Sequence, residues 1–133
     1  MADGTKIIGV CITPEHKELL LVKNNGVWDF PGGFMRPEEN DVDCLVRVIT
    51  EEQLPYCTLK INDNIGLFFI GDYRECDRVI AYCVDINSNL AVGDGLEEAK
   101  KFALEDLFNI KGMHQMTKTV DQMVAKLIGK GLL

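Results

Sequence analysis

No long uninterrupted apolar run occurs in this 133-residue sequence, although 47% of its residues are hydrophobic. A membrane-spanning helix needs about 20 consecutive apolar residues, so we expect no membrane partner. Residues 1–6 also lack the basic start and the long apolar stretch of a secretory signal peptide. Because no export signal is recognised, we expect a cytoplasmic protein. The length suits one domain with a core of its own.

The five cysteines include no C-x-x-C pair. Zinc sites use such closely spaced pairs, and disulfide frameworks belong to small secreted chains, so neither is expected. In a cytoplasmic protein the cysteines should be reduced thiols. They are Cys11, Cys44, Cys57, Cys76 and Cys83.

Basic residues are also scarce, since 14 Lys and Arg face 21 Asp and Glu and the net charge is −7. This balance argues against binding to a nucleic-acid polymer, which needs a basic face. It does not exclude a small nucleotide, because a metal ion can link an acidic site to phosphates. A negative surface also simply aids solubility, and composition alone favours that interpretation.

Short β-branched and apolar segments predict a chain that is mostly strand. Asn24-Asn25-Gly26 predicts a hairpin turn, so the strand after it should return antiparallel. Pro31 should then end regular pairing, and Gly32-Gly33 permits backbone angles that side chains forbid. The predicted strands are residues 6–13, 18–23, 27–30, 58–61, 65–70, 79–86 and 100–103.

Two helices are predicted among these strands. The first begins after Asn40, a suitable N-cap, and runs to about Gln53, because the following proline disfavours helical geometry at Leu54. The second covers residues 114–128 and ends at the glycines that follow. The expected core stripe of the first helix consists of Val42, Leu45, Val46 and Ile49.

Acidic residues stand next to a glycine turn in the segment that contains the first helix. Glu51 and Glu52 are adjacent and lie off the apolar stripe, and Arg47 precedes Glu51 by one helical turn, close enough to hold its carboxylate. Carboxylates on a rigid helix beside a glycine turn suit a hard divalent cation and phosphate. A solvated helix face is the default interpretation of the acidic pair by itself.

The full spacing resembles the Nudix box of the Nudix hydrolases, or MutT-like proteins. The box covers about residues 33–55, and weaker resemblance extends over most of the chain. The resemblance implies one domain over residues 1–133. It also implies an α/β/α sandwich with a mixed central sheet, a box helix after Gly32-Gly33 and a C-terminal helix. The matching residues are Gly33, Glu39, Arg47, Ile49, Glu51 and Glu52.

The resemblance implies a Mg²⁺-dependent or Mn²⁺-dependent hydrolase that cleaves a phosphoanhydride bond in a nucleoside diphosphate linked to another group. Nucleoside triphosphates, nucleotide sugars, ADP-ribose and dinucleoside polyphosphates all fit this description. Glu51 and Glu52 would be catalytic and would bind the metal, together with the backbone carbonyl of Gly32 or Gly33. Members of the family often form dimers, so a homodimer is expected as well.

Arg47 and Glu39 would support the box in this interpretation. The chain departs from the family pattern at Val48, where a glutamate is usual, and at Leu54, where a glycine is usual. A carboxylate from elsewhere can replace the missing ligand, and Glu97 and Glu98 are the candidates to position the attacking water.

Asp94 is a weaker candidate for that role. The departures at Val48 and Leu54 favour an alternative, a Nudix-fold module that binds a nucleotide or metabolite without cleaving it. A protein-interaction domain that retains only the fold is a third hypothesis. For stacking a nucleobase, the candidates are Trp28 and Tyr73, the latter in a polar loop.

Overall fold

Two sheets and four helical segments make up the part of the chain that the computed structural model describes. The mixed α/β class predicted from the sequence is confirmed. The described residues are 4–13, 15, 17–68, 78–87, 91–93, 95–113 and 115–133.

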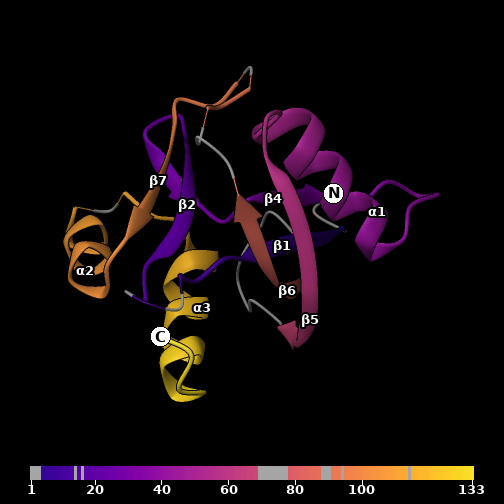
Figure 1. Ribbon diagram of the computed structural model, residues 1–133. Helices are drawn as coiled ribbons and strands as arrows, with labels where there is room; N and C mark the ends of the chain where they lie inside the picture. The colour runs from indigo at the N-terminus through magenta and orange to yellow at the C-terminus, as the bar shows by residue number, and fades with distance from the viewer. Residues whose placement is uncertain are drawn as a thin grey trace.

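The larger sheet is mixed and has the strand order β4-β1-β6-β5. Its strands are β4 (Gly32–Phe34), β1 (Thr5–Val10), β6 (Arg78–Asn87) and β5 (Thr58–Phe68). β1 runs parallel to β6 and antiparallel to β4, while β5 and β6 are antiparallel. β4 is therefore an edge strand, and it presents the glycine pair beside β1 (Figure 1).

The smaller sheet has the order β3-β2-β7 and is antiparallel throughout. It consists of β3 (Val27–Asp29), β2 (Leu19–Asn24) and β7 (Glu98–Phe102). Asn25 and Gly26 join β2 to β3 with φ values of 53° and 78°. Two consecutive positive φ angles are what a two-residue hairpin turn requires, so the predicted hairpin is confirmed.

Helices lie on both faces of the sheets. In Figure 1, α1 (Asp41–Val46) lies at one flank of the molecule, whereas α2 (Leu104–Gly112) and α3 (Lys118–Gly129) lie toward the other. A π-helix, η1 (Arg47–Gln53), continues directly from α1. Among the described residues, no helix combines the length and apolarity needed to cross a membrane.

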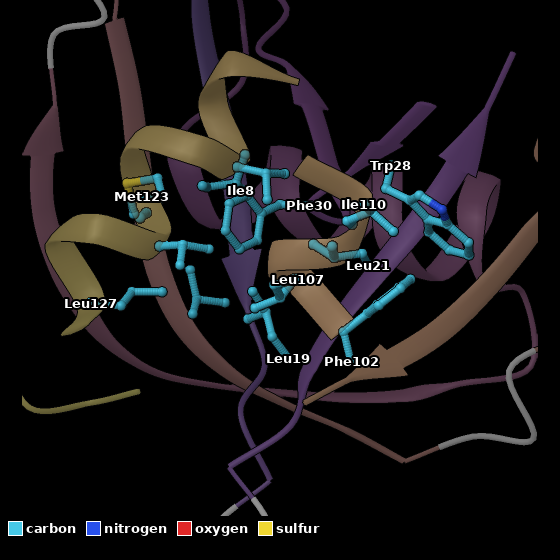
Figure 2. Close-up of a cluster of buried hydrophobic side chains, with 14 of the residues drawn as sticks. Ile8, Leu19, Leu21, Trp28, Phe30, Phe102, Leu107, Ile110, Met123 and Leu127 are labelled. Atoms are coloured by element: carbon cyan, nitrogen blue, oxygen red, sulfur yellow. The ribbon is translucent and has the colours of Figure 1, made fainter. Parts of the chain in front are cut away.

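The first core cluster fills the space between the sheets and the pair α2 and α3. Alternate residues of the strands contribute to it, such as Ile8 of β1 and Leu21 of β2, and Met123 contributes from α3 (Figure 2). Trp28 packs edge-to-face against Phe102, with 4.7 Å between ring centroids. Burying such aromatic rings stabilises the fold more than most other contacts.

The second core cluster lies on the opposite face, under α1 and η1. Ile7 of β1 and Leu20 of β2 contribute to it, and these residues alternate with those of the first cluster. Side chains on both faces of the central strands are therefore buried, which accounts for the continuous apolar run in β2. This arrangement places the box helix against β1 and β4.

A buried ion pair joins the two sheets near β4. Asp29 accepts a hydrogen bond from Lys6 Nζ at 2.5 Å and from the Thr117 hydroxyl at 3.0 Å. Lys6 is only 5% exposed, so its charge needs this partner. Asp29 thus links β1, β3 and the start of α3 immediately before the glycine pair.

Three elements differ from the sequence prediction. Pairing was expected to end at Pro31, but it is interrupted only at Phe30 and Pro31, because the unpredicted strand β4 pairs with β1 directly after them. The predicted strands 58–61 and 65–70 are one strand, β5, with two register shifts, although residues 69 and 70 lie outside the described residues. α2 was not predicted, since its N-cap residue, Ala103, makes no side-chain capping bond and marks no helix start.

The last helix begins later than predicted. α3 starts at Lys118, where the Thr117 hydroxyl accepts a hydrogen bond from the Val120 N–H at 3.3 Å. The predicted first residue, His114, lies outside the described residues. Met123 of this helix is buried in the core.

The buried face of α1 and η1 is rotated relative to the predicted stripe. Val42 and Val46 are 44% and 39% exposed, whereas Leu45 and Ile49 are fully buried as predicted. The rotation has a physical reason: Cys44 and Val48 must pack against Gly33 of β4, and both are buried there.

Candidate functional site

The glycine bend in β4 can be formed only by glycine at its first position. Gly32 has a φ of 142°, and a Cβ atom there would lie 2.1 Å from the Ile7 carbonyl oxygen. At Gly33 a Cβ atom would instead meet the methyl groups of Val48 at 3.2 Å. The bend therefore lets β4 approach both β1 and η1 closely.

Hydrogen bonds order the loop between β4 and α1. The Asn40 side chain accepts from the Asp43 N–H at 2.8 Å, which confirms the predicted N-cap. Glu39 Oε1 accepts from the Arg36 N–H at 2.9 Å. These bonds hold the carboxylate of Glu39 next to the helix that follows.

Arg47 joins the loop, β4 and η1. Its Nε donates to Glu39 Oε2 at 2.5 Å, and its Nη2 donates to Glu39 Oε1 at 2.9 Å and to the Phe34 carbonyl at 3.3 Å. Its Nη1 donates to Glu52 Oε2. The guanidinium is therefore committed to two carboxylates, and such bidentate pairs are strong and directional.

The pairing of Arg47 with Glu52 corrects the expectation that Arg47 holds Glu51. In η1 the Leu54 N–H donates to the Ile49 carbonyl at 2.8 Å, which is the five-residue bond of a π-helix. Because the π-helical turn is wider than an α-helical turn, Arg47 meets the fifth residue after it, Glu52, and not the fourth, Glu51. Glu51 and Glu52 are both exposed at the end of η1.

Glu39 and Arg47 stabilise each other's charged forms. Hydrogen bonds from Arg47 and from the Arg36 N–H lower the pKa of Glu39 from 4.5 to about 2. The same pair raises the pKa of Arg47 above its usual value. Glu39 is therefore ionised throughout the physiological pH range.

Acid should remove this stabilising contribution. Because the folded pKa of Glu39 is about 2 and its ordinary value is 4.5, the contribution is complete above pH 4.5 and is lost as pH falls toward 2. We expect the melting temperature of Glu39→Gln to lie below that of wild type at pH 6, and the gap to narrow toward pH 2. Thermal melts across this range measure it, with exposed Glu105→Gln as a control. A gap independent of pH would contradict the assignment.

A cleft of about 390 Å³ opens between the glycine bend, η1 and the loop before β7. Of the residues predicted from the sequence, it brings together Gly33, Arg47 and Glu52. The full lining is Asn24, Gly32, Gly33, Phe34, Arg36, Arg47, Val48, Glu52, Gln53, Gly95 and Leu96. Its volume is in the range of small-molecule sites.

Several lining residues were not predicted. Arg36 is exposed and adds a second guanidinium to the cleft. Phe34 is 45% exposed. Phe34 follows the glycine pair directly and Arg36 comes two residues later, so their position inside the box could have pointed to them. No sequence pattern pointed to Gln53, because its hydrogen-bond partner, Gly32, lies 21 residues away in the sequence.

The two departures from the family pattern have structural explanations. Val48 is 6% exposed and forms part of the cleft wall against Gly33. Leu54 is fully buried in the second core cluster, and its φ of −129° does not require glycine. Cys44 is a small, fully buried side chain next to the bend: burial raises its pKa, and its thiol lies 3.8 Å from the Gly33 carbonyl oxygen.

Glu97 and Glu98 lie beyond the cleft lining, next to Leu96. Glu97 Oε1 accepts from the Gly26 N–H at 2.8 Å, and its other oxygen lies 3.9 Å from Lys23 Nζ. Glu98 begins β7 opposite Lys23 and is exposed.

The structure does not bring every remaining candidate to the cleft. Trp28 is buried in the first core cluster, where its ring packs on Phe102. Asp94 and Tyr73 lie outside the described residues.

Divalent metal ions would find few protein ligands here. In the part of the chain that is described, no group of three or more His, Cys, Asp or Glu is arranged to hold a metal. The candidate donors are the carboxylates of Glu51 and Glu52 and the backbone carbonyls of the glycine bend. Of these, Glu52 also accepts from Arg47, and the Gly32 carbonyl also accepts from Gln53 Nε2. Mg²⁺ usually takes one or two carboxylates and completes its shell with water and substrate phosphates. The donor set fits an ion shared with a phosphorylated ligand.

Comparison with known proteins gives one family. The NUDIX domain model matches residues 5–123. A sequence comparison with curated proteins finds no match.

Solved structures share the fold. A MutT protein from Methanosarcina mazei Go1 has a TM-score of 0.74 at 19% identity, over 97% of this chain and 95% of that one. A NUDIX hydrolase from Nitrosomonas europaea has a TM-score of 0.73 at 14% identity, over 96% and 90%. A bifunctional NMN adenylyltransferase/ADP ribose pyrophosphatase from Francisella tularensis, complexed with AMP and a manganese ion, has a TM-score of 0.63 at 18% identity, over 96% and 42%.

Proposed function

Because the chain belongs to the NUDIX domain family, we propose that it is a metal-dependent hydrolase acting on a nucleoside diphosphate linked to another group. The observation that carries this proposal is the cleft, which gathers the glycine bend, Arg36 and Glu52 around one space of about 390 Å³. The AMP and manganese bound by the F. tularensis relative support a nucleotide ligand and a divalent ion.

Glu51 and Glu52 are the residues that would hold Mg²⁺ or Mn²⁺, together with a carbonyl of the glycine bend. When bound, the ion would neutralise phosphate charge and lower the pKa of a coordinated water. Arg36 is exposed in the cleft and presents a guanidinium fork, which matches phosphate geometry. Water would attack phosphorus, the anhydride bond would break, and a nucleoside monophosphate would leave.

Arg47 and Glu39 act as supports in this proposal. Three of the polar contacts of Arg47 go to Glu39 and to the Phe34 carbonyl, so its guanidinium has a fixed place under the cleft. Its bond to Glu52 holds that carboxylate near the glycine bend. Arg47 therefore has a positioning role in this proposal and does not take part in the chemical step itself.

The proposal is tested by incubating the protein with Mg²⁺ or Mn²⁺ and a panel of nucleotides. The panel contains nucleoside triphosphates, ADP-ribose, nucleotide sugars and dinucleoside polyphosphates. We expect metal-dependent release of nucleoside monophosphate from at least one compound, and its loss when a chelator is added. No product from any compound at saturating metal would reject the enzymatic function.

Glu97 or Glu98 is proposed to position the attacking water, because Gly95 and Leu96 directly before them line the cleft. One of Glu97→Gln and Glu98→Gln should then lower kcat by about 100-fold. A glutamine at position 97 retains an acceptor for the Gly26 N–H, so the hairpin contact is preserved. Steady-state kinetics measure the effect, with Glu105→Gln as the exposed control. Unchanged kcat in both variants would remove this role.

A second candidate function is a module that binds a nucleotide without cleaving it. The apolar wall at Val48 and the pairing of Glu52 with Arg47 favour it, because both reduce the number of free carboxylates in the cleft. Such a module would show a higher melting temperature with a compound from the panel, and no product.

A further inference from the structure

Gln53 makes two hydrogen bonds to the backbone of one residue of the glycine bend, Gly32. The Gly32 N–H donates to Gln53 Oε1 at 2.8 Å, and Gln53 Nε2 donates to the Gly32 carbonyl at 3.1 Å. The side-chain amide therefore pairs with Gly32 as a neighbouring strand would. Gly32 and Gln53 both line the cleft.

The backbone of Gln53 also contacts the loop that precedes β7. The Gly93 N–H donates to the Gln53 carbonyl at 2.9 Å. A Cβ atom on Gly93 would lie 2.1 Å from the Glu52 carbonyl oxygen, so this contact needs glycine. Gly95 and Leu96, a little further along, line the cleft. The end of η1 is therefore the point at which β4 and this loop meet.

At neutral pH the amide of Gln53 can make both bonds to Gly32, whereas a carboxylate cannot. The N–H of Gly32 needs an acceptor and its carbonyl needs a donor, and Gln supplies one of each. A glutamate would supply acceptors only when ionised, and it would extend the acidic pair Glu51-Glu52 to three adjacent carboxylates. Gly32 has a φ of 142°, which glycine adopts readily and other residues rarely do.

We propose that Gln53 is a positioning residue, whose amide fixes the backbone of Gly32 against η1 and so sets the place of the Glu52 carboxylate beside the glycine bend. Its effect on turnover rests on the proposed hydrolase function. The hydrogen-bonded pair itself exists without substrate and is measured separately.

The first test uses Gln53→Leu and Gln53→Glu, with exposed Gln122→Leu as the matched control. Amide hydrogen exchange, followed by NMR, reports the Gly32 N–H. We expect exchange about tenfold faster in Gln53→Leu. In Gln53→Glu and the control it should stay near the wild-type rate, since a carboxylate still accepts from this N–H. An unchanged rate in Gln53→Leu would overturn the proposal.

The second test measures binding of Mn²⁺ alone by electron paramagnetic resonance. We expect about tenfold weaker binding in Gln53→Leu and unchanged binding in the control. Equal affinity in wild type and Gln53→Leu, or no Mn²⁺ binding by wild type, would overturn the positioning role. If wild type binds Mn²⁺ but cleaves no nucleotide, the hydrolase function fails while this comparison still decides the role of Gln53.

The third test separates positioning from folding. We expect kcat of Gln53→Glu to fall about tenfold or more at neutral pH with KM little changed. A kcat of Gln53→Glu equal to that of wild type would contradict the need for a donor to the Gly32 carbonyl. Melting temperatures of all variants show whether each one is folded.

Discussion

Glu52→Gln is expected to lower turnover by on the order of 100-fold to 1,000-fold, as the loss of one group that stabilises developing charge does in other enzymes. Glu52 is the acidic side chain that the structure places in the cleft lining. Glutamine keeps nearly the same shape and still accepts a hydrogen bond from Arg47. The substitution therefore removes the charge and leaves the contacts of η1 in place.

Steady-state kinetics at saturating Mg²⁺, with the substrate found in the panel, measure this effect. Glu51→Gln should lower kcat by a smaller factor, because Glu51 is exposed at the end of η1 and is not part of the cleft lining. Glu105→Gln, at the exposed start of α2, should leave kcat unchanged. A Glu52→Gln protein with wild-type turnover would falsify the assignment of the metal site to this carboxylate.

Gly32→Ala should produce the largest loss of stability. A Cβ atom at this position would lie 2.1 Å from the Ile7 carbonyl oxygen, and φ is 142°. Overpacking against a fixed backbone atom and strain at this conformation together cost about 3–5 kcal/mol. For a chain of this length that lowers the melting temperature by about 10–20 °C.

Thermal unfolding followed by circular dichroism checks this loss, with Gly26→Ala as the control. Gly26 also has a positive φ, 78°, but no atom lies within 4 Å of the position of its added Cβ. The control should therefore lose only about 1–2 kcal/mol. Equal melting temperatures for the two variants would mean that β4 shifts away from β1 without cost.

Much of the fold follows from local patterns in the sequence. The apolar run in β2, the Asn25-Gly26 turn and the cap at Asn40 each act over a few residues, and each is confirmed. The family of the chain was also predictable, because the box spacing combines several residue types over one continuous segment. A homodimer, a cytoplasmic location and a single domain over residues 1–133 stay predictions.

The strand β4, the π-helix η1 and the helix α2 could not be predicted from local sequence patterns. β4 is a strand because Gly32 and Gly33 meet β1, and the residues themselves have little strand preference. The expected contact of Arg47 with Glu51 assumed α-helical spacing, but η1 is a π-helix, so Arg47 meets Glu52. α2 could not be predicted from a capping residue, because none precedes it. Its buried residues Leu107 and Ile110 pack into the first core cluster.

The sequence by itself determined the family, the alternation of buried strand residues and the pair of carboxylates that follows Arg47. These depend on residue type and on spacing along one segment. Only the tertiary structure decided which carboxylate lies in the cleft, that Val48 forms its wall, and that Gln53 bonds Gly32. The reason is that these contacts join segments distant in sequence, and their geometry depends on the wider turn of η1 and on the close approach of β4 to β1.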